Sequence, residues 1–141
     1  MGIEIIYKKL EQMKVLLDEL EMLLGKPFSA THLDMINIRA AEREFQLIVE
    51  LASDINTTIL IDKTGETPDS YRASFSNLAK LGIFKEQTLL KLVTSARLRN
   101  ILVHEYDFDE DYQKFYESTK EFTPAYREYI EVILNFVSGN R

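Results

Sequence analysis

The sequence contains no cysteine among its 141 residues. This absence excludes disulfide bonds, thiolate catalysis and zinc sites built on cysteine. No apolar run approaches the roughly 20 residues that a membrane-spanning helix needs. The first six residues include an early acid and lack the layout of a signal peptide. We therefore expect a cytoplasmic protein with no membrane anchor.

Several motifs that carry chemistry are also missing. The sequence has no glycine-rich phosphate loop, no hydrolase elbow and no zinc motif. The acidic run 107–111 resembles a calcium loop at first glance, but Tyr112 and Ser118 stand where an EF-hand needs glycine and glutamate. The Glu-x-x-His motif of metal-binding bundles is absent, because Ile101 lies three residues before His104. We expect neither a metal ion nor a cofactor.

The charge of the chain is unevenly distributed. A net charge of −6 argues against a surface that coats nucleic acid in general. Between Ser70 and His104, however, six residues are basic and only Glu86 is acidic. A locally positive segment on an acidic chain fits one site for an anionic ligand, although chance clustering on solvated helix faces would give the same pattern.

Hydrophobic residues recur at helical spacing almost everywhere, and no segment reads convincingly as a strand. We expect helices at about 3–24, 31–60, 71–81 and 85–104, and a last one that the acidic run 107–111 opens. Thr31 with Asp34 resembles a capping box, and the loop 62–69 is the clearest break. The prediction is one all-α domain over residues 1–141, an up-and-down four-helix-type bundle with an additional short helix.

Pro124 leaves two possibilities for the last helix. Proline has no backbone N–H and either kinks a helix or stands in its first turn. The helix therefore either bends at Pro124 or gives way to a new helix capped by Thr123.

The helix at 85–104 carries the polar residues that stand out most. Arg99 and Asn100 fall where its apolar stripe should continue, and polar groups on a packing face are costly unless they are paired or used. The stripe itself consists of Leu89, Leu92, Val93, Ala96 and Val103. Asn100 lies four residues before His104, so it shares a helix face with the imidazole and is placed to orient it.

Arg99 and His104 are five residues apart, roughly 140° around an ideal helix. They converge only if the arginine folds back, the helix distorts or a second chain completes the site. RNA is cut without metal when its own 2′-hydroxyl attacks the adjacent phosphorus. Histidine suits the proton transfers, and arginine suits the charge on the phosphoryl oxygens. Both a base and an acid are needed, and a two-fold dimer would supply a second histidine.

The segment Arg99 to Tyr106 resembles the signature of the HEPN superfamily, an arginine and a histidine separated by four residues, with a polar residue directly after the arginine. Its ending is similar to the HepT-like toxin branch. The segments 42–46 and 50–55 look like that branch's second helix, and residues 71–84 look like its lead-in to the motif. The resemblance covers roughly residues 35–115.

The resemblance implies a HEPN-like bundle that forms a homodimer and cleaves RNA without metal, with Arg99 and His104 as catalytic residues and Asn100 in support. It also implies a toxin neutralised by a partner antitoxin of the minimal nucleotidyltransferase type. In that branch the partner adenylylates the tyrosine two residues after the histidine, and Tyr106 occupies this position. Added AMP would bring bulk and negative charge beside the phosphate site.

Other interpretations remain open from the sequence. The chain could be a non-catalytic HEPN module that docks a nucleotidyltransferase, or a structural bundle in which the motif only pins a dimer. Arg99 could simply pair with Glu105 or another acid. For Glu50 and Asp54 we favour a solvated helix face over a place near the site, and we assign His32 no role.

Overall fold

The computed structural model describes residues 2–25, 35–104 and 108–139, without the side chains of residues 104 and 108–112. These residues contain the helices α1 (Ile3–Leu24), α3 (Met35–Thr64), α4 (Tyr71–Ala79), α5 (Glu86–His104) and α6 (Phe108–Gly139), and no strand. None of the described helices is both long and apolar enough to cross a membrane.

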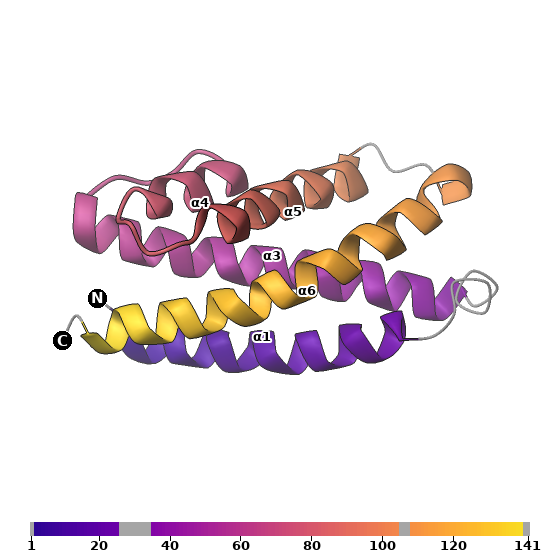
Figure 1. Cartoon of the computed structure of the whole chain (residues 1–141), viewed down its shortest axis with the longest axis horizontal. Helices are drawn as coiled ribbons and strands as arrows, with labels where there is room; N and C mark the ends of the chain where they lie inside the picture. The colour runs from indigo at the N-terminus through magenta and orange to yellow at the C-terminus, as the bar shows by residue number, and fades with distance from the viewer. Residues whose placement is uncertain (1, 26–34, 105–107, 140–141) are drawn as a thin grey trace.

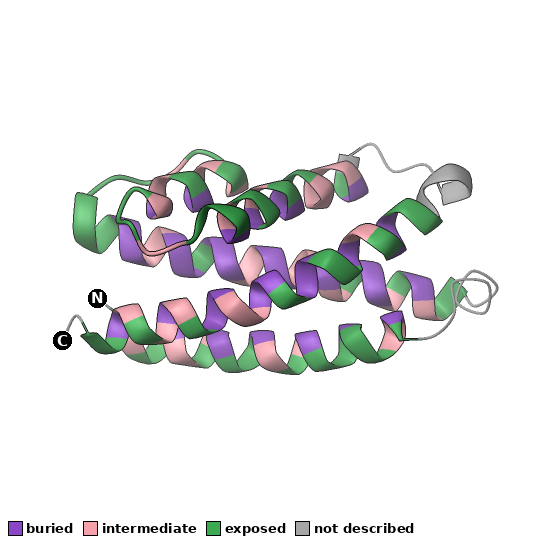
Figure 2. Cartoon of the chain, viewed as in Figure 1, coloured by how far each residue is buried: buried purple, intermediate pink, exposed green. Residues whose placement is uncertain are grey.

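The four long helices form the bundle and α4 is the additional short helix (Figure 1). α3 packs against α1 on one side and against α4 and α5 on the other, and α6 contacts both α1 and α5. Buried residues face the interior and exposed residues face outward along each long helix (Figure 2). The predicted fold class is confirmed.

The periodicity of α1 predicted both its bounds and its buried face. All six residues of its apolar stripe are at most 3% exposed: Ile6, Leu10, Met13, Leu17, Leu20 and Leu24. Their three- and four-residue steps place them on one side of the helix, which packs onto α3 and α6.

α3 runs about one turn past its expected end at Leu60. It ends at Thr64, and Gly65 follows with a φ of 75°, a left-handed conformation that suits glycine. Ser70 then caps α4, because its side chain accepts a hydrogen bond from the backbone N–H of Ala73 at 3.0 Å. The expected start of α3 at Thr31, with its capping box, lies outside the described residues.

α6 is one continuous helix with Pro124 inside it, so of the two possibilities left open by the sequence, the new helix at Thr123 does not occur. Because Pro124 has no N–H, the carbonyl of Lys120 loses its usual helical donor. The Thr123 hydroxyl lies 3.5 Å from that carbonyl oxygen and supplies a weak replacement.

A buried chain of hydrogen bonds connects α6, α3 and α4. The hydroxyl of Tyr129 lies 2.6 Å from Asn56 Oδ1, and Asn56 Nδ2 donates to Ser74 Oγ at 3.1 Å. Ser74 in turn donates to the carbonyl oxygen of Tyr71 at 2.7 Å. Asn56 and Ser74 are fully buried, so each would be costly without these partners. The network fixes the first turn of α4.

Two carboxyl groups meet where α1 packs on α3. Glu44 extends from α3, and one of its oxygens, Oε1, is buried with no hydrogen-bond partner among the described residues. Burial is the main cause that raises the pKa of Glu44 to about 8, and the hydrogen bond and charge of Glu19 on α1 add to it.

Because Glu44 binds its proton more tightly in the folded state, the free energy of unfolding should fall as the pH rises from 4.5 to about 8. Glu44→Gln should remove this part of the pH dependence. The free energy of unfolding of the variant, relative to that of the wild type, should therefore be higher at pH 8 than at pH 5. Denaturant unfolding over a pH series measures the effect. Glu11→Gln, an exposed change on α1, is the control, and parallel curves for Glu44→Gln and wild type would contradict the prediction.

Candidate functional site

The apolar stripe of α5 breaks at Arg99 and Asn100, as the sequence indicated. Leu92 and Ala96 are fully buried, whereas Arg99 and Asn100 are half-buried. One expected member of the stripe is misplaced: Val103 is 44% exposed, and its neighbour Leu102 is buried instead. The site therefore lies where polar residues interrupt the buried face of α5.

Three side chains surround the guanidinium of Arg99. Its Nη2 donates to Glu50 Oε2 on α3 at 3.4 Å, and its Nη1 donates to Asn100 Oδ1 at 3.3 Å. The ring of Tyr71, the first residue of α4, lies under the guanidinium carbon at 4.5 Å, a cation–π contact. Arg99 is thus held by residues of α3, α4 and its own helix.

These contacts orient Arg99 without satisfying it. Charge-assisted hydrogen bonds are typically about 2.7–2.9 Å long, so both of its bonds are stretched. Its Nε is buried with no hydrogen-bond partner among the described residues, although the side chain as a whole is 16% exposed. An incoming anion with short, bidentate hydrogen bonds would exchange favourably with these weak contacts.

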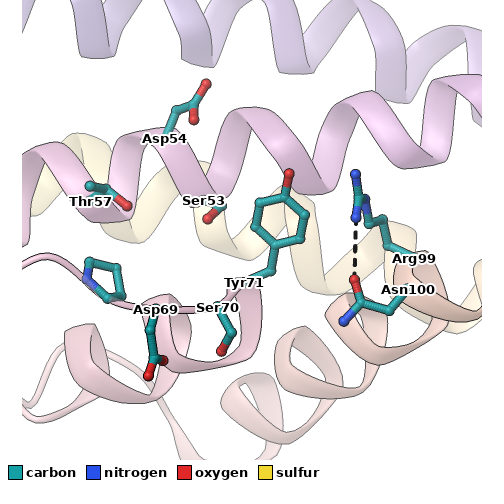
Figure 3. A pocket seen from close by; sticks show the side chains of 9 residues that line it. Ser53, Asp54, Thr57, Asp69, Ser70, Tyr71, Arg99 and Asn100 are labelled. Atoms are coloured by element: carbon teal, nitrogen blue, oxygen red, sulfur yellow. Dashed lines mark hydrogen bonds between the residues drawn. The ribbon is translucent and has the colours of Figure 1, made fainter. Parts of the chain in front are cut away.

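Arg99 opens into a pocket of about 450 Å³ between α3, α5 and the start of α4. In Figure 3 the ring of Tyr71 stands between Arg99 and Asn100 on one side and Ser53 and Thr57 on the other. Among the residues that the structure describes, the lining consists of Ser53, Asp54, Thr57, Pro68, Asp69, Ser70, Tyr71, Arg99 and Asn100.

Of the predicted site residues, Arg99 and Asn100 lie in contact, whereas the His104 side chain and Tyr106 are not among the described residues. Asn100 accepts a hydrogen bond from Arg99, and its predicted role in orienting His104 concerns a side chain outside the described residues. His104 is the last residue of α5, and its side chain lies outside the described residues, as does all of Tyr106. Because α5 is helical through His104, the backbone positions of Arg99 and His104 differ by roughly 140° and about 7.5 Å along the axis.

Sequence reasoning missed two residues of the site. For Glu50 the expectation of a solvated face is wrong, because it contacts Arg99 and Arg43 Nη1 also lies 4.0 Å away. Asp54, one turn further on, fits that expectation better: it is 60% exposed and pairs with Lys9 at 3.1 Å. Tyr71 belongs to the segment 71–84 that resembles the HepT-like lead-in, but the spacing of residues in the sequence does not indicate that it lies beside Arg99.

Comparison with known proteins agrees with this fold. The family model described as Ribonuclease HepT-like matches residues 8–133, and the chain belongs to this family. A curated relative, "tRNA nuclease HepT" of Aphanizomenon flos-aquae (strain 2012/KM1/D3), is 40% identical over 75 residues, or 52% of this chain. The match spans 50% of that relative's length.

Solved structures share the whole architecture. A toxin–antitoxin complex named MntA–HpeT contains a chain with a TM-score of 0.82 and 23% identity, covering 94% of this chain and 98% of that one. The tri-AMPylated HEPN toxin of Shewanella oneidensis, in complex with an MNT antitoxin, gives a TM-score of 0.66 at 23% identity and covers 88% of this chain and 97% of that one.

Glu50 partly neutralises Arg99, so removing its charge should strengthen anion binding at this site. We expect Glu50→Gln to bind a single-stranded deoxyoligonucleotide about two- to fivefold more tightly, as for the loss of a partly exposed ion pair. Fluorescence anisotropy at low and high salt measures the change. Glu117→Gln makes the same charge change on α6, and equal gains in the two variants would show that Glu50 has no specific effect.

Proposed function

We propose that this protein is the toxin of a toxin–antitoxin pair and acts as a metal-independent endoribonuclease. The observation that carries the proposal is the weakly paired guanidinium of Arg99, which lines an open pocket. Arg99 stands five residues before His104 in the sequence. The HepT-like family and the relative named as a tRNA nuclease support RNA as the substrate.

In this mechanism Arg99 binds the oxygens of the scissile phosphate and stabilises the charge that develops there. His104 takes the proton from the 2′-hydroxyl, whose oxygen attacks the adjacent phosphorus. The bond from phosphorus to the 5′-oxygen breaks, and a second histidine protonates that leaving oxygen. The products are a 2′,3′-cyclic phosphate and a 5′-hydroxyl end.

The second histidine comes from the other chain of a homodimer. α5 is helical through His104, which argues against a distortion that would bring Arg99 and His104 together. Glu50 and Tyr71 direct Arg99 toward α3 and α4, so folding back along α5 would break these contacts. A two-fold axis beside α5 is the remaining way to collect two copies of each residue.

The catalytic assignment is tested with Arg99→Ala and His104→Ala. Each should lower the rate of RNA cleavage by about 100-fold or more, because each removes transition-state stabilisation or proton transfer. Cleavage by the wild type should persist in EDTA and leave cyclic or 3′-phosphate ends. Arg97→Ala removes an exposed arginine of the same helix and should cleave normally. Full activity of His104→Ala would refute the mechanism, and so would the loss of wild-type cleavage in EDTA.

The composite site predicts how mixed dimers behave. If both histidines serve one site, a dimer with one His104→Ala chain is inactive, and activity follows the square of the wild-type fraction. At equal amounts of both chains, about a quarter of the activity should remain. Co-refolding the chains at several ratios and measuring cleavage tests this. A linear dependence would show that each chain works alone.

We also propose that a minimal nucleotidyltransferase antitoxin neutralises the toxin by adenylylating Tyr106, with the AMPylated HEPN toxin complex as support. Incubation with such a partner and ATP should raise the mass of the chain by whole AMP units and abolish cleavage. Tyr106→Phe should gain no mass and stay active. If Arg99→Ala instead loses antitoxin binding and the wild type cuts no RNA, the protein is the non-catalytic docking module.

A further inference from the structure

The pocket beside Arg99 has opposite charges at its two ends. Arg99 and Asn100 line the pocket on one side of Tyr71, and Asp54 and Asp69 line it on the other, with their carboxylates pointing in opposite directions (Figure 3). Asp54 is neutralised by its ion pair with Lys9. Asp69 has no ion pair among the described residues, so its charge is not neutralised. A phosphate is therefore attracted to the Arg99 end and repelled from the other.

The middle of the pocket suits a flat, neutral group with polar edges. The ring of Tyr71 and the ring of Pro68 supply apolar surface. The hydroxyls of Ser53 and Thr57 both donate and accept hydrogen bonds, so they match the mixed edges of a nucleobase or a ribose. Bases of single-stranded RNA stack on tyrosine rings and on guanidinium planes, and here Arg99 and Tyr71 already form one stacked unit.

The size of the pocket agrees with this chemistry. Its volume of about 450 Å³ lies within the range of roughly 300–1,000 Å³ that is usual for small-molecule sites. It is large enough for one nucleoside next to the phosphate that Arg99 holds.

We propose that this pocket binds the base and ribose of one nucleotide flanking the phosphate on Arg99, with the base stacked on Tyr71 and no second phosphate at the Asp54–Asp69 end. The choice of ligand rests on the proposed function, but the site makes a claim of its own. It assigns Tyr71 to substrate binding and the carboxylate of Asp69 to the exclusion of a neighbouring phosphate.

Nucleoside monophosphates and ribose 5-phosphate test the proposal by binding alone. The wild type should bind the base-bearing monophosphates roughly tenfold or more tightly than ribose 5-phosphate, as base stacking on an aromatic ring implies. NMR titration of the whole protein measures these weak affinities. Nuclear Overhauser contacts between base protons and the Tyr71 ring should appear in the same samples.

Two substitutions at Tyr71 form a matched pair. Tyr71→Phe keeps the ring and should keep the tenfold difference, whereas Tyr71→Leu should lose it. The ratio of the two affinities is the readout, because Tyr71→Leu also removes the cation–π contact that holds Arg99 and should weaken the binding of ribose 5-phosphate as well. A nonaromatic variant that still distinguishes base-bearing from base-free phosphates would overturn the role of Tyr71.

The acidic end is tested with a nucleoside 3′,5′-bisphosphate. The second phosphate should add no affinity in the wild type and should add several-fold in Asp69→Asn, because the repulsion by the carboxylate that has no ion pair is gone. Equal binding of base-bearing and base-free phosphates by the wild type overturns the subsite even if Tyr71→Leu fails to fold. Since no assay here requires cleavage, base-dependent binding by a protein that cuts no RNA would sustain the subsite and refute the proposed function separately.

Discussion

The guanidinium of Arg99 is the group on which the rest of the site depends. It is mostly buried, yet its two hydrogen bonds, 3.4 Å to Glu50 and 3.3 Å to Asn100, are longer than a charged pair prefers. A tightly paired arginine would be a structural residue, and an unpaired one would adopt many rotamers. Here the contacts are strong enough to orient the side chain and weak enough to yield to a phosphate.

The bundle holds Tyr71 in place so that it can hold Arg99. The buried network from Tyr129 through Asn56 and Ser74 ends on the carbonyl oxygen of Tyr71. Burial raises the pKa of Tyr129 well above its ordinary value, so its hydroxyl remains a donor. The network joins α6, α3 and α4, and it links the core of the bundle to the geometry at the surface.

Much of the fold was predictable because the relevant information is local. The apolar stripe of α1 is such a case, because the three- and four-residue steps of its own sequence set both the bounds and the buried face of the helix. Where prediction failed, the outcome depended on tertiary packing. α6 continues through Pro124 because packing against the neighbouring helices stabilises α6 on both sides of the proline. Phe122 and Tyr126, which flank Pro124, are both buried.

The site was only partly predictable, for a related reason. An interrupted apolar stripe revealed that Arg99 and Asn100 had some use, because this disagreement lies within one helix. The partners of Arg99, Glu50 and Tyr71, lie 49 and 28 residues earlier in the chain. They belong to helices whose own hydrophobic periodicity is regular, so it does not mark them.

Periodicity tells which face of a helix is buried, but it does not give the register at which two helices cross. Only that register decides whether Glu50 or Asp54, one turn apart on α3, meets Arg99. The choice has a chemical consequence, because a carboxylate at the guanidinium tunes phosphate binding, whereas Asp54 pairs with Lys9 of α1. The same two acids on one helix therefore acquire different roles from a packing offset of about 6 Å, the rise of four residues.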